Sequence, residues 1–266
     1  MRLDSKVIVV TGGGNGIGGQ VVLGLLAAGA RVAAVDLSAT GLADIAGRAN
    51  AGRRLSTHTV DITDRAAVLA LPDAVVAAHG QVDGLVNVAG IVHHFKPVSR
   101  LGFDDIERVM AVNFWGTVNT TKAFLPLLAA RPESALVNVA SMGSLVPVPG
   151  QSAYGASKAA VKLFTEGLIA EHQGIQPRVS VVFPGGIATN ILGNSGISLP
   201  GRDAGAAAAA KLTSPQDAAR QIIDAVVTGR PRVVIGRDAR MLDRLGRLAP
   251  TRAIPFIAGK MRDLIK

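Results

Sequence analysis

Cysteine is absent from this chain of 266 residues, and aromatic side chains are scarce, with one tyrosine, one tryptophan and seven phenylalanines. Without cysteine, a disulfide framework and a thiolate metal site are both excluded. The five histidines show no metal-ligand spacing, so we expect no bound metal. The lack of disulfides fits a reducing cytoplasm, where we expect the protein to work.

Long hydrophobic runs are also missing. No stretch approaches the ~20 consecutive apolar residues of a membrane span. The first apolar run, KVIVV, leads directly into glycines and does not resemble the core of a signal peptide. Because 48% of the residues are hydrophobic and only 18% are charged, we expect a soluble chain with one well-filled core and no disorder.

Acidic residues become scarce toward the C-terminal end. Residues 230–266 hold 10 lysines and arginines against 3 acidic residues, and so contribute +7 of the net charge of +9. Within the tail, residues 237–266, apolar side chains recur at helical spacing before a proline: Met241, Leu242, Leu245 and Leu248. Such a basic amphipathic tail can make peripheral contact with an anionic membrane. Packing over a substrate lid or against another subunit is the interpretation we favour, and we expect no specific nucleic acid partner.

Short β-branched runs alternate with helical patterns along residues 1–236. Strands are predicted at 6–12, 31–36, 54–61, 82–90, 135–141, 178–186 and 232–236. Between them, helices are predicted near 16–30, 39–52, 64–80, 103–130, 152–172 and 215–228. This order predicts a single α/β domain, a doubly wound sheet of about seven parallel strands with helices on both faces. A ligand should bind beyond the carboxyl ends of the strands. The long loop at 186–214 is predicted to be a lid over that site.

The segment TGGGNGIG, residues 11–18, follows the first predicted strand and opens the first predicted helix. Glycines there let the backbone approach a pyrophosphate, and the free amides at the helix start favour an anion. Asp36 ends the next strand, where a carboxylate can accept hydrogen bonds from both ribose hydroxyls of an adenosine. Neither Asn15 nor Leu37 supplies a cation for a 2′-phosphate, so we predict NAD and not NADP.

Together with four further motifs, this segment resembles the short-chain dehydrogenase/reductase family over nearly the whole chain. TGGGNGIG matches the family's TGxxxGxG, residues 87–90 (NVAG) match NNAG except at Val88, and YGASK at 154–158 matches YxxxK. Ser141 stands thirteen residues before Tyr154, as is usual in the family, and PGG at 184–186 is followed by Thr189. The resemblance implies a Rossmann fold and pairing into tetramers or dimers through Phe103–Ala130 and Ser152–His172.

The resemblance also implies the site residues. The catalytic residues would be Asn113, Ser141, Tyr154 and Lys158. The NAD-binding residues would be Gly12, Asn15, Gly16, Ile17, Gly18, Asp36, Asp61, Ile62, Asn87, Ala89, Gly90, Tyr154, Lys158, Pro184, Gly185, Ile187 and Thr189. In this scheme Asn113 fixes a water that links Lys158 to solvent, and Lys158 also contacts the nicotinamide ribose.

The spacing of the only tyrosine and Lys158 supports proton chemistry independently. Residues i and i+4 share a helix face, so the ammonium should lie beside the phenol and lower its pKa from ~10. Such a phenol can exchange a proton with a carbinol while hydride passes to or from the nicotinamide. Ser141, at a strand end, can donate a hydrogen bond to the substrate oxygen.

The segments expected around the carbinol are mostly apolar. They are Val92–Phe95, in which the two histidines are expected in a surface turn, Met142, Leu145–Val148, Ile187, Ile191 and Leu192. The sequence therefore predicts an NAD-dependent oxidoreductase that interconverts a secondary alcohol and a ketone on a hydrophobic small molecule, such as a steroid, terpenoid or lipid. The alternatives are a 3-oxoacyl or ketone reductase and, more remotely, a non-catalytic nucleotide-sensing or nucleic-acid-binding protein.

Overall fold

A seven-stranded, wholly parallel sheet forms the centre of the molecule, in the order β3-β2-β1-β4-β5-β6-β7. The computed structural model describes residues 1–189, 191–195 and 212–260. The strands are β1 (Val7–Thr11), β2 (Arg31–Asp36), β3 (Leu55–Thr59), β4 (Gly84–Asn87), β5 (Ala135–Val139), β6 (Arg178–Pro184) and β7 (Arg232–Ile235). The predicted doubly wound Rossmann architecture is confirmed.

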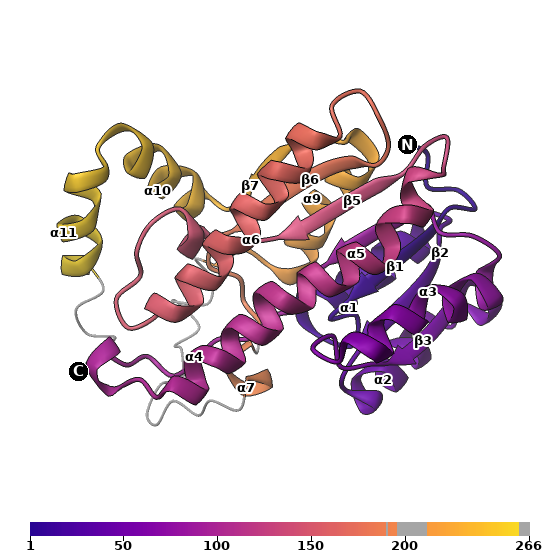
Figure 1. Ribbon diagram of the computed structural model, residues 1–266, viewed down its shortest axis with the longest axis horizontal. Helices are drawn as coiled ribbons and strands as arrows, with labels where there is room; N and C mark the ends of the chain where they lie inside the picture. Colours follow the sequence, from indigo (N-terminus) through magenta and orange to yellow (C-terminus); the bar gives the residue numbers. More distant parts are fainter. Residues whose placement is uncertain (190, 196–211, 261–266) are drawn as a thin grey trace.

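Helices cover both faces of the sheet (Figure 1). The helices are α1 (Gly16–Ala27), α2 (Ala39–Ala49), α3 (Arg65–His79), α4 (Phe103–Met110), α5 (Gly116–Ala129), α6 (Ser152–Glu171), α7 (Ile191–Asn194), α9 (Pro215–Thr228), α10 (Arg237–Leu248) and α11 (Pro250–Lys260). One core cluster packs α1, α2 and α9 against the sheet, and a second packs α3, α5 and α6 against its other face. Two buried layers hold the strand ends at fixed positions.

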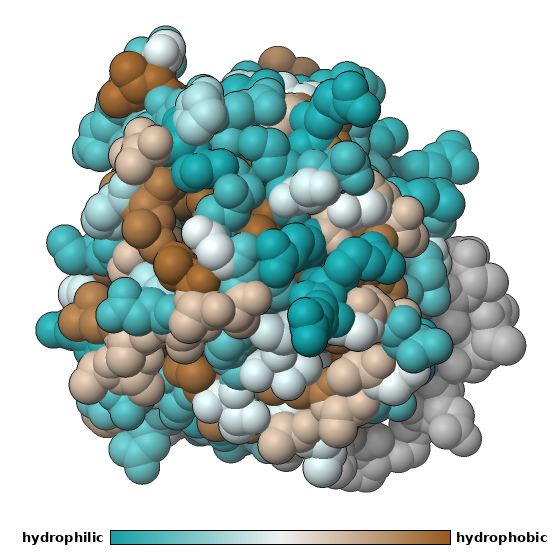
Figure 2. Space-filling view, turned by 90° about the vertical axis from the view of Figure 1, so that its right-hand side faces the viewer, coloured by the Kyte–Doolittle hydropathy of each residue, from teal (hydrophilic) through white to brown (hydrophobic). Residues whose placement is uncertain are grey.

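The central strands are buried on both faces, which explains their nearly continuous β-branched sequences. Every residue of β1 and of β5 is buried. The edge strand β3 instead has exposed residues at Thr57 and Thr59. The side of the molecule that carries β3, α2 and α3 is mostly hydrophilic, with hydrophobic residues scattered among the polar ones (Figure 2).

The predicted long helix at 103–130 differs from the structure in one respect. A π-helical turn, Ala111–Trp115, separates α4 from α5. Such single wide turns occur inside helices and are frequent at functional sites. The sequence carries no proline or glycine inside the turn that would have signalled it. The buried Asn113 lies in this turn.

Residues 237–260 of the C-terminal tail fold as two helices, with a break at Ala249, before Pro250. Both helices lie toward one end of the molecule in Figure 1, beyond the end of the sheet where β7 lies. Of the predicted lid, residues 190 and 196–211 lie outside the described residues. In the described part of the chain, no helix is long and apolar enough to cross a membrane.

Candidate active site

The glycine-rich turn between β1 and α1 needs glycine at two positions for different reasons. Gly12 has φ of +67°, a left-handed conformation, and a β-carbon there would lie 2.9 Å from the backbone of Ala89. A β-carbon on Gly18 would overlap the carbonyl oxygen of Gly12. The turn is therefore tight enough to place the start of α1 directly at the carboxyl edge of the sheet. Asn15 precedes α1 and makes no side-chain cap to it, which leaves the first amides of the helix available to an anion.

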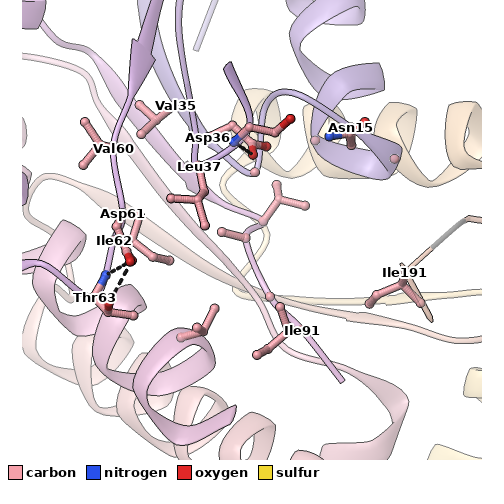
Figure 3. Close-up of a pocket in the computed structure, with 18 of the residues that line it drawn as sticks. Asn15, Val35, Asp36, Leu37, Val60, Asp61, Ile62, Thr63, Ile91 and Ile191 are labelled. Atoms are coloured by element: carbon pink, nitrogen blue, oxygen red, sulfur yellow. Dashed lines mark hydrogen bonds between the residues drawn. The ribbon is translucent and has the colours of Figure 1, made fainter. Parts of the chain in front are cut away.

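A cavity of about 620 Å³ opens at this edge, over the glycine-rich turn (Figure 3). Its size lies within the usual range for small-molecule sites. Its wall consists of Gly12, Asn15–Gly18, Val35–Ser38, Val60–Thr63, Val88–Ile91, Arg108, Ala111, Val112, Thr189 and Ile191. Among the predicted cofactor-binding residues, the structure brings the glycine turn, Asp36, Asp61, Ile62, Ala89, Gly90 and Thr189 to this cavity, which we call the groove.

Asp36 ends β2 and is held rigidly at the groove. One carboxylate oxygen accepts a hydrogen bond from the amide of Gly14 at 2.9 Å, and the other accepts one from the amide of Ser38, also at 2.9 Å. Each oxygen keeps a second lone pair that can accept a further hydrogen bond. The half-exposed carboxylate can therefore receive two ligand hydroxyls without losing the contacts that orient it.

Asp61 and Ile62 line the groove on the side that follows β3. An oxygen of Asp61 accepts hydrogen bonds from the amide and the hydroxyl of Thr63, both at 2.8 Å, which fixes the turn (Figure 3). Ile62 is buried, and its side chain packs where a β-carbon on Gly116 would otherwise project. Ile191, which the sequence predicted beside the substrate, also lies in this wall. Sequence reasoning missed Val60, Thr63, Arg108 and Val112. No motif marks them, because their positions depend on how neighbouring elements pack.

Asn87 lies beneath the groove and is not among its lining residues. Its amide nitrogen donates to Asn138 on β5 at 2.9 Å, and its amide oxygen accepts from Thr120 on α5 at 2.8 Å. The hydroxyl of Thr11 accepts hydrogen bonds from the amides of Val88 and Ala89. The side chain of Asn87 thus joins the sheet to α5, while the backbone after it forms the groove wall.

Tyr154 lies on the first turn of α6 beside Ser141, which follows β5. Burial raises the pKa of Tyr154, and a hydrogen bond with the Ser141 hydroxyl lowers it by a smaller amount. The net direction is opposite to the one that the sequence predicted from Lys158 alone. The reason is desolvation, because a phenolate largely surrounded by protein loses more solvation energy than one hydrogen bond returns.

Lys158, one turn after Tyr154, is almost fully buried at 3% exposure. Its ammonium donates to the carbonyl of Val139 at 3.0 Å, and burial lowers the pKa of Lys158 to about 8. A β-carbon on Gly90 would lie 3.0 Å from this nitrogen and 3.2 Å from the amide oxygen of Asn113. The structure therefore brings Lys158 and Asn113 together at the backbone of Gly90.

The side chain of Asn113 connects three elements. Its amide oxygen accepts from the amide of Ile91 at 2.8 Å, and its amide nitrogen donates to the carbonyl of Ile91 and to the hydroxyl of Ser157. Its backbone carbonyl, inside the π-helical turn, accepts from the hydroxyl of Thr117 at 2.8 Å. The predicted role of Asn113 in a water relay stays a prediction.

The segment after β6 carries the predicted residues Pro184, Gly185, Ile187 and Thr189. Thr189 reaches the groove, where its methyl group faces Gly16. The other three residues lie at the end of β6 and are not among the described residues that line the groove. The amide of Gly186 donates to Asp238 on α10 at 2.7 Å, and β-carbons on Gly185 or Gly236 would overlap that carboxylate.

The expected substrate segments are only partly as predicted. His94 is exposed, but His93 is 4% exposed and lies in a small cavity next to the groove. The prediction that both histidines occupy a surface turn is therefore wrong for His93. Its carbonyl accepts a hydrogen bond from Gln151, three residues before Tyr154. Val146 is also buried, because it packs against Leu242 of the tail instead of facing an open pocket.

Comparisons with known proteins agree with this geometry. Residues 6–198 match the short chain dehydrogenase family. A Mycobacterium tuberculosis protein, SadH, which is described only as an oxidoreductase, is 41% identical over 92% of this chain and 91% of its own length. D-threitol dehydrogenase of Mycolicibacterium smegmatis is 35% identical over 71% of this chain and 73% of its own length.

A solved short chain dehydrogenase from Burkholderia cenocepacia, in complex with NADP, superimposes with a TM-score of 0.79 at 27% identity, covering 98% of this chain and 99% of that one. The matched family region contains the glycine-rich turn, Asp36, Ser141, Tyr154 and Lys158. These matches, together with the seven-stranded parallel sheet and its groove, show that the chain belongs to the short-chain dehydrogenase/reductase family of oxidoreductases.

Proposed function

We propose that this protein is an NAD-dependent oxidoreductase that interconverts a secondary alcohol and a ketone on a hydrophobic small molecule. The observation that carries the proposal is the contact between Ser141 and Tyr154 next to Gly143. The buried Lys158 follows Tyr154 by one helical turn, and its ammonium lies at Gly90 in the wall of the groove. The family assignment supports a nicotinamide dinucleotide as the cofactor. The groove, which has the free helix amides and Asp36 side by side in its wall, fits such a molecule.

The preference for NAD rests on the charge around Asp36. A 2′-phosphate beside this carboxylate would be repelled. Within the described wall of the groove, the only cation is Arg108, which also lines the small cavity with His93 at the substrate end. The NADP in the Burkholderia cenocepacia structure was bound by a protein only 27% identical, so the choice of dinucleotide needs its own test.

Each group around the reacting carbon would have a separate role. The bound dinucleotide would take or give the hydride. The Tyr154 phenol would exchange a proton with the substrate oxygen, and the Ser141 hydroxyl would hold that oxygen by a hydrogen bond. Lys158, with a pKa of about 8, could carry a proton between the phenol and solvent near neutral pH.

The raised pKa of Tyr154 favours a second candidate, reduction of a ketone or 3-oxoacyl group. A phenol that stays protonated at neutral pH is ready to donate its proton to a developing alkoxide. Oxidation of an alcohol requires the opposite proton transfer. It would depend on the charges of Lys158 and of the bound cofactor to lower the pKa of the phenol.

A substrate screen by NADH fluorescence tests the proposal. Steroids, terpenoid alcohols and fatty alcohols, with threitol as the polyol control, would be offered with NAD and with NADP at several pH values. We expect turnover of an apolar secondary alcohol or its ketone, with the larger kcat/KM for NAD. Turnover of threitol alone would contradict the substrate class, and a larger kcat/KM for NADP would contradict the cofactor.

A further inference from the structure

The two C-terminal helices are attached to the substrate side of the molecule by their inner faces. Leu242, Ala253 and Ile257 pack on Val146, with Met142 at the edge of the cluster. A β-carbon on Gly246 would lie 2.9 Å from Val146, so the contact between α10 and this segment is close. The segment directly follows Ser141. The two helices therefore cover the segment that follows Ser141, next to the proposed active site, and their outer surface faces away from it.

The acidic residues of α10 and α11 are engaged by the body of the protein. Asp238 accepts a hydrogen bond from the amide of Gly186 at 2.7 Å. Asp243, 8% exposed, receives two hydrogen bonds from Arg232, at 2.7 and 3.0 Å. These are the only two acids in residues 237–260. Neither carboxylate is therefore directed toward the solvent side of the two helices.

The outer surface of the two helices combines exposed cations with exposed apolar side chains. The cations are Arg237, Arg240, Arg244, Arg247, Arg252 and Lys260. The large apolar side chains are Met241 at 54% exposure, Leu248 at 85%, Ile254 at 54% and Phe256 at 46%. On α10, Met241, Arg244 and Leu248 follow the i, i+3, i+7 spacing of one helix face. On α10, large apolar side chains and arginines are thus neighbours on one face. We call this face, together with the exposed residues of α11, the tail surface.

We propose that the tail surface docks on an anionic lipid bilayer. Arginines gain free energy from a negatively charged leaflet, and exposed apolar side chains gain it by entering the boundary between headgroups and acyl chains. Both features are needed to explain the surface. A nucleic acid would be bound by the cations but would leave Leu248 and Phe256 in water. A symmetric contact between two copies would place arginines opposite arginines.

Docking in this orientation would bring the segment after Ser141 close to the bilayer, where an apolar substrate is dissolved. The proposal concerns attachment and does not require turnover. It can therefore be tested, and can fail, independently of the proposed oxidoreductase function.

The test is flotation of the full-length protein with vesicles of phosphatidylcholine alone and of phosphatidylcholine with phosphatidylglycerol. We expect flotation with the anionic vesicles only, decreasing as ionic strength rises. At about fivefold per arginine, the triple variant Arg244→Gln, Arg247→Gln, Arg252→Gln should bind about a hundredfold more weakly. The double variant Met241→Ser, Leu248→Ser should lose about tenfold or more, because the apolar contribution is removed.

The matched control is Arg53→Gln, Arg65→Gln, Arg100→Gln, which makes the same change in charge at exposed positions outside the tail. It should float like the wild type. Thermal unfolding and cofactor binding of every variant check that the fold is intact. The proposal is overturned if the wild type fails to float at low ionic strength, or if the two triple variants behave alike. It is also overturned if the Met241, Leu248 variant changes the oligomeric mass and not the flotation, or if duplex DNA displaces the vesicles.

Discussion

The carboxyl edge of the sheet has two halves that are built in different ways. The half over β1 to β4 forms the groove, and its key contact joins Gly14 and Asp36, which are 22 residues apart. The half over β5 to β7 holds Ser141, Tyr154 and Lys158, and its loop after β6 is held by Asp238, 52 residues from Gly186. The first half is assembled mainly from the turns that follow β1 to β4, and Thr189 and Ile191 reach it from the loop after β6. The second needs the C-terminal tail to be folded in place.

The two halves of this edge also differ in the chemical groups that they present. The groove presents backbone amides and a half-exposed carboxylate, which suit binding. The second half contains a phenol and an ammonium whose pKa values are both changed by burial. This contrast suggests that changes in the groove alter cofactor affinity, whereas changes beside Tyr154 alter the chemical step. The following predictions test that separation.

The largest effect is expected from Tyr154→Phe. The variant keeps the ring but loses the only phenol in the chain, so kcat should fall by about 10²–10⁴-fold. The KM for the dinucleotide should stay within about threefold, since the groove itself is unchanged. Steady-state kinetics on the best substrate of the screen would measure both. A variant that turns over like the wild type would remove the basis of the mechanism.

A change at Asp36 should alter the cofactor preference and leave the chemical step intact, the reverse of the Tyr154 variant. Asp36→Asn keeps the shape of the side chain but removes the charge that orients ribose hydroxyls and repels a 2′-phosphate. Because hydrogen bonds to charged groups contribute about 1.5–3 kcal/mol each, the ratio of kcat/KM for NAD over NADP should fall by about a hundredfold. Asp73→Asn, at an exposed position on α3, is the control. An unchanged ratio would show that Asp36 does not select the dinucleotide.

The burial of Lys158 should be visible in the pH dependence of stability. The pKa of Lys158 in the folded protein is about 8, below the ordinary value of 10.5. At a pH between 8 and 10.5, Lys158 is therefore mostly protonated in the unfolded chain and mostly deprotonated in the folded one. The free energy of unfolding should therefore rise with pH in this window, by about 1.4 kcal/mol per pH unit, or about 2 kcal/mol between pH 8 and pH 9.5. Urea unfolding of the wild type and of Lys158→Met would measure this rise. The variant should lack it, and equal slopes would contradict the assigned burial.

Asp238 should connect the tail to the cofactor. Asp238→Ala removes the acceptor for Gly186 and should raise the KM for the dinucleotide by about tenfold, because the loop that carries Thr189 loses its support. Asp238→Asn retains an acceptor oxygen and should restore most of the affinity. Asp224→Ala, an exposed change on α9, serves as the control. A lower melting temperature with an unchanged KM would assign Asp238 a role in stability alone.

Local features of the site were predictable because each depends on a short stretch of chain. The turn at Gly12 and the placement of Asp36 follow from a strand, a glycine-rich turn and a second strand. Other features depend on distant partners. The π-helical turn around Asn113, the burial of His93 and the tail packing on Val146 left no periodic pattern in the sequence.

The amino-acid sequence alone determined the parallel sheet, the helix order, the family and the candidate residues, because hydrophobic periodicity and glycine positions act over a few residues. Only the tertiary structure decided the direction of the pKa changes at Tyr154 and Lys158 and the hydrogen bonds of Asp238 and Asp243. It also decided which side of the basic tail faces solvent. The physical reason is that desolvation and long-range hydrogen bonds depend on what surrounds a group in space, and residues far away in the chain supply those surroundings.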